Sequence, residues 1–523
     1  MLYFWHILIV PAGAVHGAGG AFSEGQTMRL AGRRRDVLMT VGFNIVLQAV
    51  TMLCGFVLPP LIVRTFGSEV NGMVASISQF IACLNLVEAG IGGAAIASLY
   101  RPLAEGDADR RNAILSAAAT FYRKSGRAFV LLVLLLALAY PLAVGGEVDR
   151  VQAGLMVLVL GITGTAEFFL IGKYRVLLTA DRKVSVISAV QMLALLASTL
   201  LSVALIEAGC GIVMVKLASA LVYMGRYVFI TLYVRSHYSG LDFRAPPDTE
   251  SVSQSRSVLV HQVGGFVVFN SPLVIITLFC PLSEASVYAV YAMVFTALGN
   301  LLGSLSNGMQ AFFGESLIKN SIGTTQSAFG LYETLFYAAT GWTFSCAHLL
   351  TVPFMAIYTR SMTDALYVRP ALAVLFVAVG VANFMRKPCD LLITAAGHFR
   401  QTQWRSLLES AINVVASVVL TLRFGTVGVL LGGICSYLYR TLDIIIYANV
   451  RILRRSPLYS LAKIGGCLAV CAVMVLLLGR GEFFPQTYLE WLAKAAARGA
   501  VLAAPGLCLA VLLIHSRRGS GAK

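Results

Sequence analysis

The sequence predicts an all-α polytopic membrane protein with about fourteen transmembrane helices, arranged as two six-helix bundles and two further helices. Composition is the first reason: 58% of the 523 residues are hydrophobic and 12% are charged, whereas soluble domains are about a quarter charged. Apolar stretches of about 20 residues, the length that crosses a bilayer with its backbone groups paired, recur along the chain. The third reason is the distribution of basic residues among the loops.

Fourteen stretches have the required length and apolar character. In order, we expect transmembrane helices over 37–63, 70–99, 128–146, 151–171, 184–206, 210–234, 258–280, 286–314, 331–358, 368–395, 406–422, 425–449, 459–479 and 490–514.

The loops between these stretches alternate in charge. Lys and Arg are retained on the cytoplasmic side of a membrane, and more than half of the 40 basic residues fall in the loops of one side. The loops of the other side hold five: Arg64, Arg150, Arg360, Arg423 and Arg480. We therefore expect both termini in the cytoplasm, which requires an even number of spans.

Two segments lie outside the spans. Residues 1–27 include a short apolar run that lacks a preceding positive segment, so we interpret them as a disordered extension or a misplaced initiation site. The longest inward loop, 235–257, is polar and contains Pro246 and Pro247, as expected of a linker. It separates an N-terminal bundle at 28–234 from a C-terminal bundle at 258–455, which leaves 456–523 as two additional helices and a basic tail.

A short repeat relates the two bundles. Ser68-Glu69-Val70-Asn71 and Ser283-Glu284-Ala285-Ser286 each follow the first span of a bundle and open a long second span. Each second span also runs into small residues, at 90–94 and at 303–308. We interpret the bundles as repeats related by a pseudo-twofold axis, with a cavity between them.

Three segments resemble a known family. Residues 66–107, the sequence FMRKPCDLLITAAGHFRQTQ at 384–403 and the glycine-spaced segment 409–440 look like the polysaccharide-transporter (Wzx-like oligosaccharide flippase) branch of the multidrug/oligosaccharidyl-lipid/polysaccharide flippase superfamily. The resemblance runs from about residue 30 to 455. It implies a bacterial cytoplasmic membrane protein that moves an oligosaccharide on undecaprenyl pyrophosphate to the outer leaflet, with membrane lipids, a polysaccharide polymerase and glycosyltransferases as partners. Twelve spans are commonest there, so 456–523 is an addition.

Cationic residues in the spans are candidates for binding a pyrophosphate, because a charge is costly there unless it has a function. The candidates are Arg386, Lys387, Lys216, Arg226 and Arg440, with Arg123 in the inward loop 101–127. Arg386 and Lys387 precede Pro388, which can kink the helix, and we expect them to bind the head group. Alternatively, Arg226 and Arg440 extend to the interface, and the segment around Arg123 lies against anionic lipid.

Carboxylates in the spans are candidates for coupling transport to a proton or sodium ion. They are Glu88, Glu167, Glu315, Asp390, Glu409 and Asp443. Glu88 is the strongest candidate, because Asn85 and small residues flank it, and Glu315 and Asp390 are further candidates. Asp390 lies one helical turn after Arg386, so the two residues alternatively pair with each other.

The sequence predicts a transporter and no enzyme, cofactor or metal site. It contains no GxxxxGK[ST] or HExxH motif, and its ten cysteines lack the spacing of metal ligands. The basic residues are dispersed, which argues against binding nucleic acid.

Two alternative transporter functions stay open. A lipid II flippase characteristically has arginines in its first span, and 37–63 has none; a cation-coupled multidrug exporter should have an acidic, aromatic cavity.

Overall fold

The computed structural model describes residues 24–88, 92–250, 256–306, 309–479 and 484–520, and this part of the chain is helical without strands. Residues 1–23 of the predicted extension lie outside the described residues, whereas residues 24–27 belong to the first helix.

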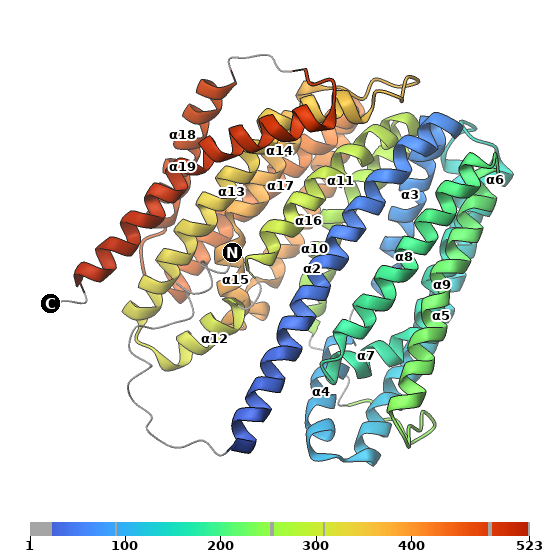
Figure 1. The fold of residues 1–523 in the computed structure, drawn as a ribbon, viewed down its shortest axis with the longest axis horizontal. Helices are drawn as coiled ribbons and strands as arrows, with labels where there is room; N and C mark the ends of the chain where they lie inside the picture. The colour runs from blue at the N-terminus through green and yellow to red at the C-terminus, as the bar shows by residue number, and fades with distance from the viewer. Residues whose placement is uncertain (1–23, 89–91, 251–255, 307–308, 480–483, 521–523) are drawn as a thin grey trace.

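Two groups of helices stand side by side (Figure 1). The N-terminal half contains α2 (Glu24–Phe66), α3 (Ser68–Leu84), η1 (Asn85–Glu88), α4 (Gly92–Glu105), α5 (Ala108–Ala143), α6 (Arg150–Ala166), η2 (Glu167–Ile171), α7 (Gly172–Ala180), α8 (Val184–Glu207) and α9 (Ile212–His237). The C-terminal half contains α10 (Arg256–Phe279), α11 (Leu282–Ser304), α12 (Met309–Lys319), α13 (Ile322–Tyr358), α14 (Pro370–Met385), α15 (Lys387–Ala395), α16 (Phe399–Phe424), α17 (Thr426–Tyr447) and η3 (Ala448–Ile452). The additional helices are α18 (Leu458–Leu478) and α19 (Tyr488–Ser520), which pack on α13.

Eleven stretches of described helix are long and apolar enough to cross a membrane. The other predicted spans correspond to the broken pair α3 and α4, to α13 and to α19. The chain is therefore a multi-pass membrane protein with a helix at every predicted span.

The segment 101–127, predicted as a loop on the inner side, is helical except at residues 106 and 107. Asp107 caps α5 by accepting a hydrogen bond from the Arg110 backbone N–H at 2.9 Å, so Arg123 lies on a helix about four turns from its start. Hydropathy missed these turns because they carry charges and lie beyond the apolar stretch. Helix formation does not stop at the membrane surface.

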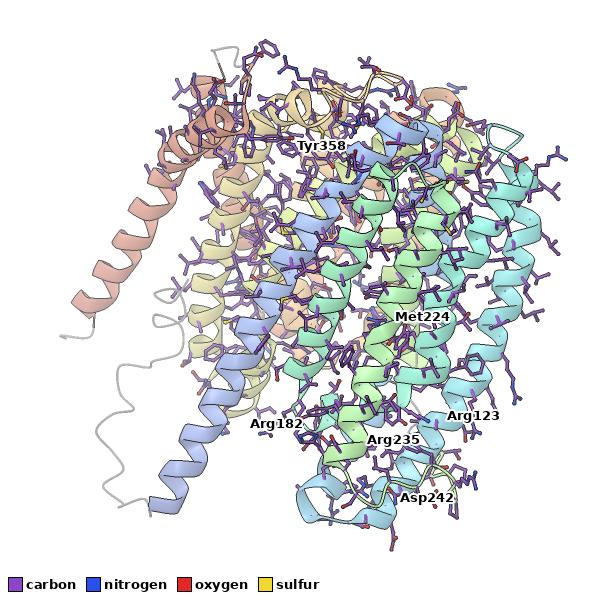
Figure 2. The ribbon with its side chains drawn as sticks, turned by 45° about the vertical axis from the view of Figure 1, so that its right-hand side comes forward. Arg123, Arg182, Met224, Arg235, Asp242 and Tyr358 are labelled. Atoms are coloured by element: carbon purple, nitrogen blue, oxygen red, sulfur yellow. The ribbon has the colours of Figure 1, made fainter. Side chains whose placement is uncertain are left out.

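The linker between the halves is also more ordered than predicted over its described residues. Ser116 Oγ of α5 donates to the Phe243 carbonyl at 3.1 Å, and the Tyr238 hydroxyl donates to Asp181. Burial and this carboxylate raise the pKa of Tyr238 above its ordinary value, which keeps the hydroxyl protonated as a donor. Asp242 of this linker lies below Arg123 in the view of Figure 2. Residues 238–250 thus belong structurally to the N-terminal half.

Helix breaks occur at matching places in both halves. The second span of each half is interrupted, at the 3-10 turn η1 in one and after α11 in the other. The fourth span is interrupted at the π-helical turn η2 in the N-terminal half and at Arg386, between α14 and α15, in the C-terminal half. The matching breaks agree with the predicted repeat.

The repeat-related residues Asn71 and Ser286 contact each other. The Asn71 side-chain amide donates to Ser286 Oγ at 2.7 Å, and both side chains are buried. A twofold axis brings equivalent residues together in this way. The backbones are also close, because a Cβ on Gly72 would lie 1.9 Å from the Leu282 carbonyl oxygen. The predicted axis therefore passes through the contact between α3 and α11.

Hydrogen bonds between the halves cluster at one end, where the sequence places the outward loops. Ser68 Oγ donates to Asp364 at 2.7 Å and lies 2.7 Å from the Tyr367 hydroxyl, which also contacts Ser286 at 2.8 Å. Thr277 of α10 donates to Ser76 of α3 at 2.7 Å. Toward the other end the two groups of helices diverge (Figure 1). We call these the outer and inner ends.

Candidate functional site

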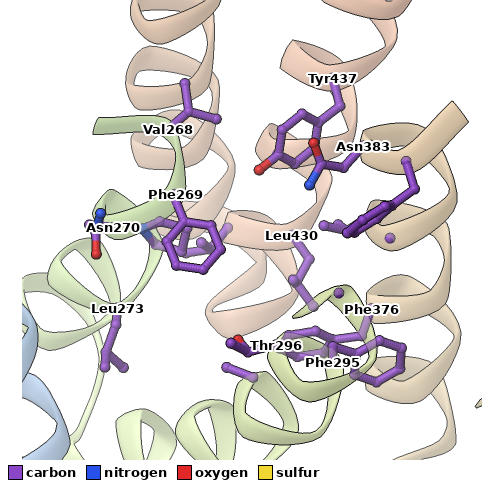
Figure 3. A pocket seen from close by; sticks show the side chains of 18 of the residues that line it. Val268, Phe269, Asn270, Leu273, Phe295, Thr296, Phe376, Asn383, Leu430 and Tyr437 are labelled. Carbon is purple, nitrogen blue, oxygen red and sulfur yellow. The ribbon is translucent and has the colours of Figure 1, made fainter. Parts of the chain in front are cut away.

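A cavity of about 410 Å³ lies among α10, α11, α13, α14, α16 and α17, with α3 and α15 contributing one side chain each. Aromatic rings including Phe269, Phe295 and Phe376 form much of its wall (Figure 3). Five side-chain amides also line it: Gln79, Asn270, Asn300, Asn383 and Asn413. This combination of rings and amides suits a polar ligand with apolar faces.

Lys387 is the cation among the lining residues, and none of the described lining residues is a carboxylate. It is the first residue of α15, directly after the break in the tenth span. Its side chain is 39% exposed, and its ammonium lies 3.8 Å from the Asp390 carboxylate. This long ion pair leaves the ammonium able to bind an anion in the cavity.

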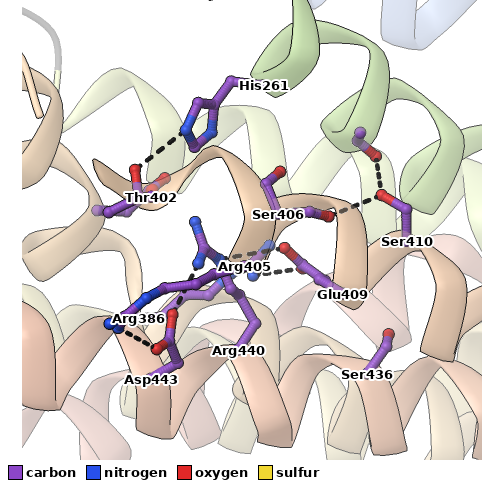
Figure 4. A network of polar contacts seen from close by, with 12 residues as sticks. His261, Arg386, Thr402, Arg405, Ser406, Glu409, Ser410, Ser436, Arg440 and Asp443 are labelled. Atoms are coloured by element: carbon purple, nitrogen blue, oxygen red, sulfur yellow. Dashed lines mark hydrogen bonds and ion pairs between the residues drawn. The ribbon is translucent and has the colours of Figure 1, made fainter. Parts of the chain in front are cut away.

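Arg386 instead lies buried beside the cavity. It donates to Glu409 at 2.5 Å (Figure 4). It also donates to Asn383 at 3.3 Å, and its guanidinium covers the Tyr437 ring at 5.1 Å. The side chains of Arg386 and Glu409 are 11% and 6% exposed. The alternative that Arg386 pairs with Asp390 is therefore wrong: the break at 386 turns its side chain toward α16, and Asp390 lies nearest Lys387.

A chain of charges continues from Glu409 to the inner side. Arg440 lies 3.3 Å from Glu409 and 2.8 Å from Asp443, and Arg405 also donates to Asp443. Arg440 is 3% exposed, so the alternative that it extends to the interface is wrong. With Arg386, the cluster holds three guanidinium groups and two carboxylates. Its net positive charge lies next to the cavity that Lys387 lines.

The N-terminal half holds a second cluster at its own helix breaks. Arg175 of α7 bridges the two carboxylates, contacting Glu88 directly and Glu167 at 3.0 Å. Arg226 of α9 contacts the other oxygen of Glu167 at 2.6 Å, and Tyr122 donates to Glu88 at 2.9 Å. The coupling candidate Glu88 is thus part of a balanced ion-pair network, 23% exposed at its side chain.

The two clusters are related by the repeat. Both sixth spans contain the pattern Tyr-x-x-Arg, as Tyr223 to Arg226 and as Tyr437 to Arg440. Tyr223 stacks on Arg226 at 4.2 Å, and Tyr437 stacks on Arg386. This shared pattern is a sequence signal that the prediction did not use.

Two of these arginines keep a free donor. The Nε atoms of Arg226 and Arg386 are buried and have no hydrogen-bond partner among the described residues. Buried donors of this kind are rare in folded proteins and mark places where a ligand or water binds.

The other predicted residues lie apart from the two clusters. Lys216 is half-buried near the outer end of α9, and Arg123 is exposed on α5. Glu315 is 63% exposed on α12 and pairs with Lys319 at 2.7 Å.

Sequence reasoning missed Arg175 and Arg405, because each lies just beyond a predicted span end and was counted as part of a loop. It also missed Glu333, which is fully buried in α13 and lies 3.0 Å from Arg455 and 3.1 Å from Lys463. These three residues join α13 to α18 and to the segment that leads into it.

The fold is that of transporters of the MOP superfamily. The structure is similar to a lipid II flippase, MurJ, in an inward closed conformation, with a TM-score of 0.63 and 13% identity over 90% of this chain and 99% of that chain. It is also similar to an inward-facing multidrug resistance MATE family transporter of the MOP superfamily, with a TM-score of 0.54 and 12% identity over 78% of this chain and 95% of that chain. No protein-family model and no curated protein matches the sequence.

Proposed function

We propose that this protein is a flippase for a lipid-linked oligosaccharide, carried on undecaprenyl pyrophosphate, in the cytoplasmic membrane of a bacterium. It supplies surface-polysaccharide synthesis, between glycosyltransferases that build the repeat and a polymerase that consumes it. The observation that carries the proposal is the cavity, which combines Lys387, five amides and aromatic rings without a lining carboxylate among the described residues.

The chemistry of this wall suits a phosphorylated glycan. Side-chain amides donate and accept hydrogen bonds, as sugar hydroxyls require, and aromatic rings pack against the apolar faces of sugar rings. Lys387 supplies a compact charge for phosphate. Arg386, beside the cavity, adds a buried Nε donor.

Transport proceeds by alternating access in this proposal. The halves rock about the contact between α3 and α11 while the lipid tail stays in the bilayer. Glu88, Glu167 and Asp390 are the carboxylates proposed to bind a coupling ion. They become available when an anionic head group binds the cationic side chains that otherwise pair with them. The membrane potential contributes roughly 2.3 kcal/mol per charge per 100 mV.

Lipid II is the second candidate cargo. The match to the lipid II flippase covers 90% of this chain, which is more than the two six-helix bundles at 28–455 contain. It therefore reaches residues outside the bundles, whereas the multidrug transporter matches 78%. A lipophilic-cation exporter is disfavoured, because a cavity lined by a lysine and, among the described residues, by no carboxylate repels cations.

Deleting the gene and profiling membrane lipids by mass spectrometry tests the cargo. Accumulation of an undecaprenyl-pyrophosphate oligosaccharide supports the proposal, and accumulation of lipid II supports the second candidate. An unchanged lipid profile with new drug sensitivity would reject both.

Lys387→Gln tests the site in the same assay. The loss of a charged contact of about 1.5–3 kcal/mol lowers head-group binding roughly 10- to 100-fold, so transport falls while membrane insertion is unchanged. The matched control is Lys319→Gln, which removes an exposed ammonium from α12. Equal transport by the two variants would reject Lys387 as a head-group ligand.

A further inference from the structure

We propose that Arg123, Lys173 and Arg235 form a binding site for the phosphate group of an inner-leaflet lipid. The site lies on the outside of the N-terminal half, away from the cavity. It adjoins the cluster of Glu88 and Glu167, since Arg123 follows Tyr122 in sequence and Lys173 lies two residues before Arg175. Its ligand is either an anionic phospholipid of the bilayer or the pyrophosphate of the transported lipid, and only the second case rests on the proposed function.

Packing between α5 and α7 brings the first two residues together. Gly172 lies so close to Tyr122 that a Cβ would meet the ring at 2.4 Å. Lys173 and Arg123 directly follow these two residues on their helices. Arg235 follows the fully buried Val234 of α9, and the charges of Arg123 and Arg235 both act on Lys173.

Lys173 is held in position by aromatic rings. Its ammonium lies 4.4 Å from the Phe243 ring centroid and 4.9 Å from that of Tyr174. These rings pack edge to face at 5.7 Å, and the hydrogen bond from Ser116 fixes Phe243. The linker between the halves therefore builds one wall of the site.

The three cations lack carboxylate partners among the described residues, unlike many basic residues of this half. Arg175 and Arg226 pair with Glu167, and Lys183 lies 3.1 Å from Asp181. The side chain of Arg123, in contrast, donates only to Thr120, at 3.3 Å, among these residues. Gathering three positive charges, one of them a half-buried ammonium, costs free energy unless an anion joins them.

Depth in the membrane identifies the anion. From Arg123 to the outer end of α5 is about 30 Å at 1.5 Å per residue, which equals the thickness of the hydrocarbon layer. Lys173 and Arg235 each lie about 35 Å from the outer ends of their spans by the same measure. Arg123 and Arg235 accordingly lie at one level near the inner end (Figure 2). That level is where lipid phosphates of the inner leaflet lie.

Native mass spectrometry and thermal unfolding of the purified full-length protein test the site, with phosphatidylglycerol and undecaprenyl pyrophosphate as ligands. Zwitterionic phosphatidylethanolamine and inorganic pyrophosphate serve as comparisons. The test variant is R123Q/K173Q/R235Q. The control variant, K124Q/R182Q/R400Q, removes three exposed inner-end charges.

The test variant should lose affinity about fivefold per charge, or roughly 100-fold in total. Without lipid it should be at least as stable as the wild-type protein, because repulsion among the cations is relieved. With lipid, only the wild-type and control proteins should gain stability.

The ligand that is lost identifies the source of the phosphate. Selective loss of phosphatidylglycerol with normal transport assigns a bilayer lipid, and selective loss of undecaprenyl pyrophosphate with slower transport assigns the cargo. Either outcome supports the site whether or not the cavity proposal holds. Equal lipid affinity in the test and control variants would overturn the proposed site. It would also be overturned if the protein bound inorganic pyrophosphate but neither lipid.

Discussion

At the scale of single residues, charges in the spans are satisfied mainly by one another. Glu409 accepts from Arg386 and lies 3.3 Å from Arg440, and Arg175 bridges Glu88 and Glu167. A charge buried without a partner would cost several kcal/mol. A cation in a span is therefore not by itself a substrate ligand, and its accessible surface and spare donors decide between the two roles.

Arg386 can be tested for both roles with a double-mutant cycle. Arg386→Gln and Glu409→Gln should each lower stability, because each leaves a buried partner incompletely paired. The loss of unfolding free energy in the double variant should be smaller than the sum of the two single losses by about 0.5–3 kcal/mol. Thermal unfolding in detergent measures this coupling, and strict additivity would refute the pairing. Transport by the double variant then reports on head-group binding separately from folding.

Glu333→Gln should be among the most damaging single substitutions. The carboxylate is fully buried with Arg455 and Lys463, and its loss leaves two cations uncompensated, at about 3–5 kcal/mol. Thermal unfolding compares it with Glu315→Gln, whose pair with Lys319 is exposed to solvent and therefore contributes little to stability. Similar unfolding temperatures for the two variants would show that Glu333 is not held as an ion pair.

At the scale of helices, close approach of α16 and α17 depends on glycine. A Cβ on Gly432 would lie 2.4 Å from the Ser417 backbone nitrogen, and one on Gly428 would lie 2.2 Å from the Leu420 carbonyl oxygen. Backbone atoms cannot move aside as the end of a side chain can. The two helices must separate if either glycine gains a side chain.

Gly432→Ala should therefore destabilise the protein by about 1–3 kcal/mol, measured as a lower unfolding temperature. Gly433→Ala is the matched control, because its Cβ would find its nearest neighbour, Val379, at 3.9 Å. Alanine also favours a helix over glycine by roughly 0.5–1 kcal/mol, so the control should be neutral or more stable. The opposite order of stability would contradict the packing argument.

Hydropathy predicted every span because it measures contact with lipid, but it did not predict how far each helix extends. The first turns of α5 bind the linker instead of lipid, so they were assigned to a loop. The ion-pair partners of Arg386 and Arg175 could not be predicted either, since each pair depends on how a broken helix turns the arginine side chain toward another helix. Local sequence contains the break at Pro388 but not its direction.

At the scale of the whole molecule, a four-residue repeat located the axis between the halves. The match between 68–71 and 283–286 predicted that these segments are equivalent, and Asn71 and Ser286 contact each other. The network of Ser68, Asp364 and Tyr367 surrounds that contact at the outer end. The sequence alone could not show at which end the two halves are joined, because one sequence is compatible with more than one conformation.

Cross-linking α3 to α11 should therefore stop transport reversibly. In a background without the ten native cysteines, N71C/S286C treated with a short, reducible thiol cross-linker would hold the outer end closed, because these positions lie across the axis within hydrogen-bonding distance. Transport in proteoliposomes should fall to background and recover when the linker is reduced. Each single-cysteine variant, treated alike, should keep its activity. Unchanged transport by fully cross-linked protein would mean that the halves do not separate at α3 and α11, and alternating access about this axis would be wrong.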